Sequence, residues 1–152
     1  MTPVARLHRD PIDPMSLVRA VSGASHGAVL LFLGVVREMN DGREVSGIEY
    51  SAYEPMAARE LSDIAQAAEA RFSSSTVAIE HRLGALALEE VSVGIAVAHP
   101  HRSVAYDASR WIIEELKRRV PIWKREQYVD GHREWVDPTA RETSTVEPEV
   151  LT

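Results

Sequence analysis

Two lysines on either side of a proline are the residues of this sequence best suited to chemistry. Lys117 and Lys124 flank Pro121, with arginines next to both. Proline lacks a backbone N–H and disfavours helical geometry in the residue before it, so a helix ending before Pro121 places Lys117 in its last turn and Lys124 beyond the break. Like charges disfavour protonation, so amines gathered among cations have lowered pKa values. Such an amine can act as a base or a nucleophile.

Two other basic groups fall at the ends of predicted elements. Arg37 follows a long apolar run, and His101-Arg102 directly precede a predicted helix. Free N–H groups at a helix start favour phosphate, and an adjacent arginine can bind it in a bidentate manner. Each group also has a simpler interpretation, as a solvated strand end, a capping segment, or cations at the negative end of a helix dipole. Together the three groups predict a pocket for a small phosphorylated anion with a reactive amine.

Composition and charge narrow the classes of function. Seventeen basic and 23 acidic residues give a net charge of −6, which argues against general binding to nucleic acid or membranes. The absence of cysteine excludes a disulfide framework and a thiol nucleophile. No carboxylate or thiol falls at ligand spacing with the histidines, so neither a metal site nor a cofactor is predicted. Residues 1–10 lack an apolar core of signal-peptide length, and no run approaches a membrane span, so we expect a cytoplasmic protein.

Hydrophobic patterning predicts an α+β domain with a mixed sheet, because helices and strands do not alternate strictly. Helices are expected to begin near Pro14, Pro55 and Ser103, the last capped by Ser103. The run at 27–36 is apolar enough for a strand buried on both faces. The turn signal Asn40-Asp41-Gly42 predicts a hairpin within 37–53. Further strands are expected at 76–83, 91–98, 122–129 and 133–136.

Residues 138–152 are polar and acidic and lack periodicity, so they are predicted to form a disordered tail. The rest of the chain, residues 1–137, is expected to be a single domain.

Four motifs, in this order, resemble the catalytic (large) subunit family of molybdopterin synthase. They are GAVLLFLGVVR at 27–37, EYSAYEPM at 49–56, HRS at 101–103 and KRRVPIWKRE at 117–126. The resemblance covers about residues 15–136. It implies an α/β-hammerhead-type fold with an inserted small antiparallel β subdomain near 37–53. It also implies a homodimer within a heterotetramer, in which each copy binds a small ubiquitin-like, β-grasp subunit.

The resemblance further implies a sulfurtransferase. In this family the small subunit carries sulfur as a thiocarboxylate on its Gly-Gly C-terminus. The sulfur is transferred to cyclic pyranopterin monophosphate to form the dithiolene of molybdopterin, so the large subunit needs no cysteine of its own. The motif match assigns catalysis to Lys117 and Lys124. The matching substrate-binding positions are Val35, Val36, Arg37, His101, Arg102, Arg125 and Glu126.

Two alternatives from other classes compete with the enzyme. In the first, the chain is a non-catalytic module that binds the C-terminal tail of a ubiquitin-like partner, with its cations forming a carboxylate nest. Docking a tail needs charge but not two amines, so Lys117 and Lys124 favour the enzyme. In the second, the segment 117–124 binds RNA, and the net charge of −6 opposes this.

Overall fold

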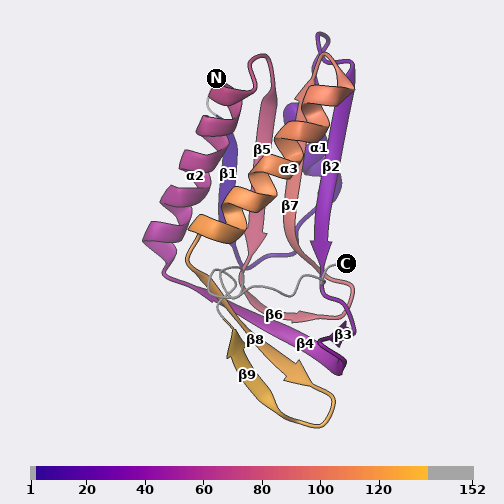
Figure 1. Ribbon diagram of the computed structural model, residues 1–152, viewed down its shortest axis with the longest axis vertical. Coiled ribbons are helices and arrows are strands. Elements are labelled where there is room, and N and C mark those ends of the chain that lie inside the picture. The colour runs from indigo at the N-terminus through magenta and orange to yellow at the C-terminus, as the bar shows by residue number, and fades with distance from the viewer. Residues whose placement is uncertain (1–2, 137–152) are drawn as a thin grey trace.

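Two β-sheets meet in the computed structural model, which describes residues 3–136 (Figure 1). The first sheet has the strand order β1-β5-β7-β2. Its strands are β1 (Val4–His8), β5 (Thr76–Arg82), β7 (Val91–His99) and β2 (Ala28–Val35). β1 runs parallel to β5 and the other neighbours are antiparallel, so the predicted mixed sheet is confirmed.

The second sheet is antiparallel and gathers segments that are far apart in sequence. Its strand order is β3-β4-β8-β9, with β6 also paired to β4. Its strands are β3 (Met39–Asn40), β4 (Arg43–Ala52), β6 (Gly84–Ala87), β8 (Ile122–Tyr128) and β9 (Arg133–Val136). The hairpin expected within 37–53 is therefore β3-β4, and it forms only part of this β subdomain.

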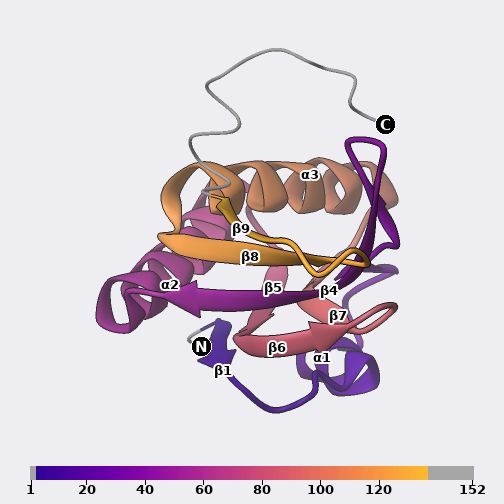
Figure 2. The same cartoon turned by 90° about the horizontal axis from the view of Figure 1, so that it is seen from below.

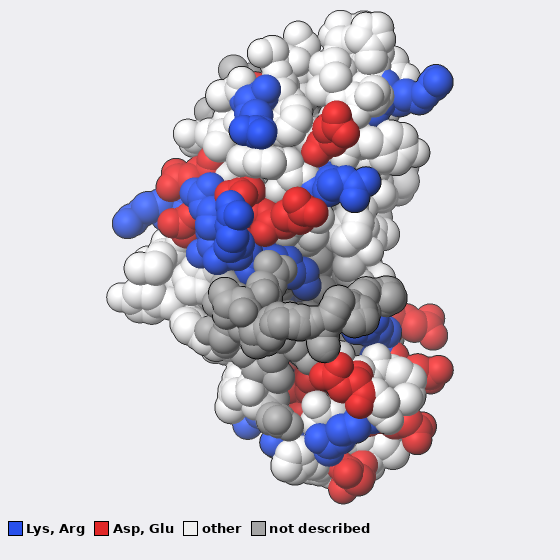
Figure 3. Space-filling model, in the orientation of Figure 1, with Lys and Arg blue, Asp and Glu red and all other residues white. Residues whose placement is uncertain are grey.

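Within residues 3–136, three helices cover the first sheet. α1 (Pro14–Val21) packs on one face, and α2 (Glu54–Arg71) and α3 (Arg102–Arg119) pack on the other (Figure 1). Seen from below, the second sheet lies across one end of this layered body (Figure 2). Figure 3 shows basic and acidic side chains intermixed over α2 and α3. The main core lies between these two helices and the sheet, where burial of apolar surface drives folding.

Local signals determine where the helices begin and end. The Asp13 side chain caps α1 by accepting a hydrogen bond from the Met15 N–H at 3.1 Å. α3 ends at Arg119, and Val120 is extended with φ −85° and ψ 124°, as expected before proline. The cap predicted at Ser103 is wrong, because α3 already begins at Arg102 and its N-cap is His101.

The predicted full burial of the run 27–36 is also wrong. β2 lies at the edge of the first sheet, paired only with β7, and Val29 and Val35 are 42% and 51% exposed. The strand buried along nearly its whole length is β7, which lies between β5 and β2. Strands β1 and β6 were not predicted. The disordered tail predicted at 138–152 lies outside the described residues. Across residues 3–136, no helix is both long and apolar enough to cross a membrane.

Candidate functional site

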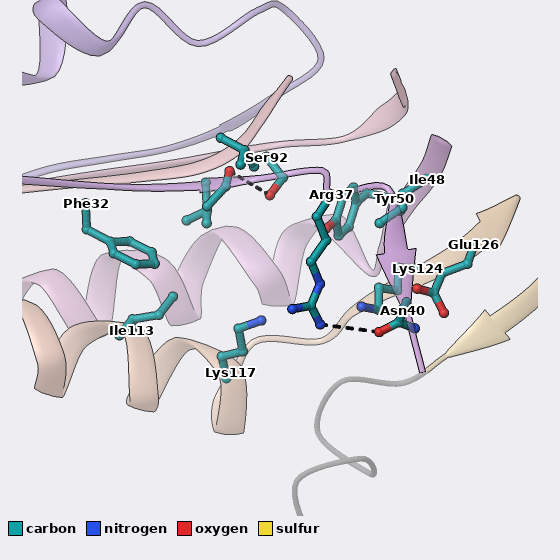
Figure 4. A pocket seen from close by; sticks show the side chains of 13 residues that line it. Phe32, Arg37, Asn40, Ile48, Tyr50, Ser92, Ile113, Lys117, Lys124 and Glu126 are labelled. Atoms are coloured by element: carbon teal, nitrogen blue, oxygen red, sulfur yellow. Dashed lines mark hydrogen bonds between the residues drawn. The ribbon is translucent and has the colours of Figure 1, made fainter. Parts of the chain in front are cut away.

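A cavity of about 330 Å³ lies where the exit of β2, the C-terminal half of α3 and the second sheet meet (Figure 4). Among the described residues, three cations line it, namely Arg37, Lys117 and Lys124. The sequence contains no lysine other than these two, and its remaining strongly basic residues are all arginines. The remaining lining residues are Phe32, Gly34, Val35, Asn40, Ile48, Tyr50, Ser92, Val93, Ile113 and Glu126.

The break at Pro121 brings the two lysines to the same cavity. Lys117 lies in the last turn of α3, and the chain leaves this helix through Val120 and Pro121 to form β8. The Pro121 carbonyl accepts a hydrogen bond from the Tyr53 N–H at 3.3 Å, which ties the connection to the end of β4. Figure 4 shows Lys117 and Lys124 reaching the cavity from α3 and β8.

Strand alternation decides which residues of β8 face the cavity. Lys124 and Glu126 line it, whereas Arg125 points to the opposite face of the sheet. There Arg125 forms an ion pair with Glu49 and lies over the Trp135 ring, 5.0 Å from its centroid. Arg125, a predicted substrate-binding residue, is therefore not part of this cavity.

Arg37 enters the cavity from the connection between β2 and β3. Its Nη2 donates a hydrogen bond to Oδ1 of Asn40 at 3.4 Å. Figure 4 shows the Arg37 side chain extending between Lys117 and Asn40. The neighbouring Val36 is instead buried in an apolar cluster with residues of the second sheet and does not line the cavity, so this predicted substrate-binding residue contributes packing.

Two polar side chains that line the cavity, the buried Glu126 and the partly buried Tyr50, are hydrogen-bonded to their neighbours. Glu126 is only 1% exposed and accepts a hydrogen bond from the Tyr128 hydroxyl at 3.0 Å. Burial raises the pKa of Tyr50, a hydrogen bond with Ser92 acts against this rise, and the charge of Glu126 adds to it. The cavity therefore has one buried carboxylate among its three cations.

His81 is a buried residue that contacts Tyr50 and does not itself line the cavity. Its ring meets the Tyr50 ring edge to face, with centroids 5.2 Å apart, and its Nδ1 donates to the Arg82 carbonyl at 3.0 Å. Burial lowers the pKa of His81 to about 4; the Arg82 carbonyl acts against this shift, and the positive charge of Lys117 adds to it. His81 is thus a neutral imidazole at neutral pH.

His101 and Arg102, both predicted to bind substrate, lie far from this cavity within the chain. They stand at the beginning of α3, and Lys117 follows Arg102 by fifteen residues of the same helix. At 1.5 Å per residue the separation along the helix axis is about 22 Å. Of the three basic groups predicted to form one pocket, a single chain therefore brings together only Arg37 and the Lys117/Lys124 segment.

The arginines next to Lys117 also lie outside the cavity lining. Arg118 pairs with Glu115, and Arg119 contacts Glu60 at 3.0 Å and Glu115 at 3.3 Å. Arg37 is therefore the arginine that lines the cavity together with the two lysines.

Several residues of the site were not identified from the sequence. The sequence indicates Asn40 only as a turn residue, includes Tyr50 in a matched motif without a role, and gives His81 no role. No group of three or more His, Asp or Glu within residues 3–136 is arranged to hold a metal ion. The only local signal for Asn40 was its place in the hairpin turn, and pattern alone does not show what such a residue faces.

Comparison with known proteins identifies the family. The family model described as MoaE protein matches residues 7–119. A molybdopterin synthase catalytic subunit of Bacillus subtilis is 40% identical over 128 residues, covering 84% of this chain and 81% of the relative. Its counterpart in Culex quinquefasciatus is 41% identical over 133 residues, covering 86% of this chain and 85% of that relative. The chain therefore belongs to the MoaE family, the family of molybdopterin synthase catalytic subunits.

Solved structures agree with this assignment. The crystal structure of molybdopterin synthase from Staphylococcus aureus matches with a TM-score of 0.82 and 35% identity, covering 87% of this chain and 96% of that one. A complex of subunits 1 and 2 of molybdopterin-converting factor from Helicobacter pylori matches with a TM-score of 0.70 at 20% identity, covering 86% and 88%. The second match supports the fold, and the first supports fold and family together.

Proposed function

We propose that this chain is the catalytic subunit of a molybdopterin synthase. It transfers sulfur from the C-terminal thiocarboxylate of a small ubiquitin-like subunit to cyclic pyranopterin monophosphate. The observation that carries the proposal is the meeting of Arg37, Lys117 and Lys124 in one cavity of about 330 Å³. The relatives, named molybdopterin synthase catalytic subunits, support this function, and the cluster of cations in the cavity supports its location there.

The use of lysine supports catalysis over simple tail binding. Arginine stays protonated in proteins, whereas lysine can lose its proton when its surroundings disfavour charge. Arginine occupies the other Lys/Arg positions of this chain, and both lysines line the cavity. A site that only had to attract a carboxylate would be served equally well by arginine. The choice of two amines is therefore explained better by proton transfer or by contact with a reacting atom.

The two sides of the cavity suit the two parts of the substrate. Arg37 can bind the phosphate, because a guanidinium matches phosphate oxygens in a bidentate manner. Phe32, Val93 and Ile113 provide apolar surface for the flat ring system. The thiocarboxylate, also an anion, enters the same positive field.

In the proposed reaction the thiocarboxylate sulfur attacks a carbon of the pterin side chain and forms a C–S bond. Lys124 stabilises the negative charge that develops, in the manner of an oxyanion donor. Lys117 donates the proton with which the oxygen on that carbon departs as water. Hydrolysis of the resulting thioester leaves sulfur on the product and a carboxylate on the small subunit. A second small subunit delivers the second sulfur.

The proposed assembly is a homodimer of this chain, in the cytoplasm, with one small subunit bound to each copy. If His101 and Arg102 bind substrate, they do so in the cavity of the second copy, since about 22 Å of helix separates them from Lys117 in their own chain. Exposed apolar side chains on β2 and α3, such as Val29 and Tyr106, offer surface for the contact.

Mixing inactive variants tests this shared site. When Lys117→Ala and Arg102→Ala chains are mixed and re-associated, a two-fold dimer with shared sites regains about a quarter of the wild-type sites. Sites contained within single chains regain none. Sedimentation of the mixture establishes whether the dimer forms at all.

The reaction itself is tested with purified chain, thiocarboxylated small subunit and cyclic pyranopterin monophosphate, and product is followed as its oxidised fluorescent derivative. Lys117→Ala and Lys124→Ala should each lower turnover by roughly 10²- to 10⁴-fold. Arg118→Ala is the matched control, because Arg118 is exposed, pairs with Glu115 and does not line the cavity. Tight binding of the small subunit without product, using components proven on a known synthase, would support the tail-binding module instead.

A further inference from the structure

Asn40 is a buried amide at the edge of the cavity. It is 7% exposed, lines the cavity, and accepts a hydrogen bond through Oδ1 from Nη2 of Arg37 at 3.4 Å. Figure 4 shows the two side chains joined in this way at the side of the cavity nearest Lys124. The hydrogen bond that the Arg37 guanidinium donates to Asn40 thus goes to an amide oxygen and not to a carboxylate.

A tight hairpin holds Asn40 in this position. Asn40 pairs with Arg43, and the two residues between them have positive φ angles, 52° for Asp41 and 77° for Gly42. This is the backbone of a two-residue type I′ turn, which reverses the chain with the twist that strands require. The Val45 N–H donates to the Glu38 carbonyl at 2.7 Å and fastens the base of the hairpin. The turn therefore folds Asn40 back beside Arg37.

Other arginines of the chain are held differently. Arg9 pairs with Glu54 at 2.8 Å, and Arg119 pairs with Glu60 at 3.0 Å. A carboxylate orients a guanidinium but also cancels much of its charge. An amide oxygen orients it through one of five N–H donors and leaves the positive charge in place. The cavity acid Glu126 is engaged by the Tyr128 hydroxyl.

We propose that Asn40 is a positioning residue that directs the Arg37 guanidinium into the cavity while leaving its charge available to an anion. This inference rests on the proposed function, in which that anion is the substrate phosphate. The β3-β4 hairpin then serves to place a neutral acceptor next to Arg37, where a carboxylate would compete with the substrate phosphate for the guanidinium.

Two substitutions separate this role from a structural one. Asn40→Ala removes the acceptor and should raise KM for cyclic pyranopterin monophosphate about 10-fold, since one hydrogen bond to a charged group is lost. Asn40→Asp keeps the size and the acceptor but adds a carboxylate beside Arg37, so it should raise KM further. A merely structural role predicts the reverse order, because Asp preserves the shape and the bond and Ala does not.

Salt dependence gives a second readout. KM should rise with ionic strength equally in the wild type and in Asn40→Ala, because both keep the charge of Arg37. In Asn40→Asp, KM should rise less steeply with ionic strength, because the added carboxylate offsets the charge of Arg37. The matched control is Met39→Asp, which places the same charge one residue away on the exposed face of β3 and should leave KM within about twofold. Equal effects of Met39→Asp and Asn40→Asp would overturn the inference.

Arg37→Ala separates failure of this inference from failure of the proposed function. If Arg37→Ala leaves KM unchanged, Arg37 does not bind the phosphate and both proposals lose that step. If Arg37→Ala raises KM and Asn40→Ala does not, only the role of Asn40 is wrong. Circular dichroism checks the fold of each variant. Asn40→Ser, which keeps a short neutral acceptor, should fall between the wild type and Asn40→Ala and serves if the alanine variant does not fold.

Discussion

Protonation of His81 should make the folded state lose stability between neutral and mildly acidic pH. Burial lowers the pKa of this imidazole from 6.5 to about 4 in the folded chain. In the unfolded chain the imidazole binds its proton near pH 6.5, so the unfolded state takes up more protons as the pH falls. Stability is therefore complete above pH 6.5 and decreases as the pH falls from there towards 4.

The size of this loss follows from the two pKa values. One pKa unit corresponds to about 1.4 kcal/mol. Between pH 7 and pH 5 the unfolded imidazole becomes almost fully protonated and the folded one stays mostly neutral, which amounts to a loss of about 2 kcal/mol. The larger loss of stability that corresponds to the full difference between the two pKa values is reached only below pH 4.

Urea unfolding at pH 7 and pH 5 measures this loss, with His81→Phe as the test variant. Phenylalanine keeps an aromatic ring against Tyr50 but cannot take up a proton. The change in unfolding free energy between the two pH values should be about 2 kcal/mol smaller in the variant than in the wild type. His101→Gln is the control, because His101 is exposed and its replacement should leave the wild-type pH dependence. An identical pH dependence in wild type and His81→Phe would refute the reasoning.

Two further substitutions test the site and the second sheet. Glu126→Gln keeps an acceptor for the Tyr128 hydroxyl but removes the buried negative charge beside the cavity cations, so it should lower kcat about tenfold with an unchanged circular dichroism spectrum. Gly47→Ala would place a Cβ 2.9 Å from the Leu86 carbonyl oxygen, so it should destabilise the fold by about 1–3 kcal/mol in urea unfolding, whereas Ser51→Ala on the same strand should cost less than half of that. A Gly47→Ala variant as stable as the wild type would contradict the pairing of β6 with β4.

Features with a local cause were predictable from the sequence. Pro121 ends α3 and extends Val120 whatever surrounds them, so the placement of Lys117 on a helix and Lys124 beyond it is confirmed. The turn signal at Asn40-Asp41-Gly42 likewise acts through the φ angles of its own residues.

Features that depend on tertiary contacts were not predictable in the same way. An apolar run indicates burial but not the position of a strand in its sheet, so β2 was wrongly expected to be buried on both faces. The short strand β1 forms through pairing with β5, more than sixty residues away in sequence. For the same reason His101 was grouped with Lys117, although one helix holds the two residues apart.

The two-residue connection between α3 and β8 links the site to the architecture. α3 packs on the first sheet and β8 belongs to the second, and only Val120 and Pro121 join them. Because Lys117 and Lys124 lie on opposite sides of this connection, their separation is set by how the two sheets are held together. The Tyr53–Pro121 hydrogen bond and the burial of Val120 and Ile122 in the main core fix that arrangement. The cavity is thus a property of the junction between the sheets and depends on segments that lie far apart in the sequence.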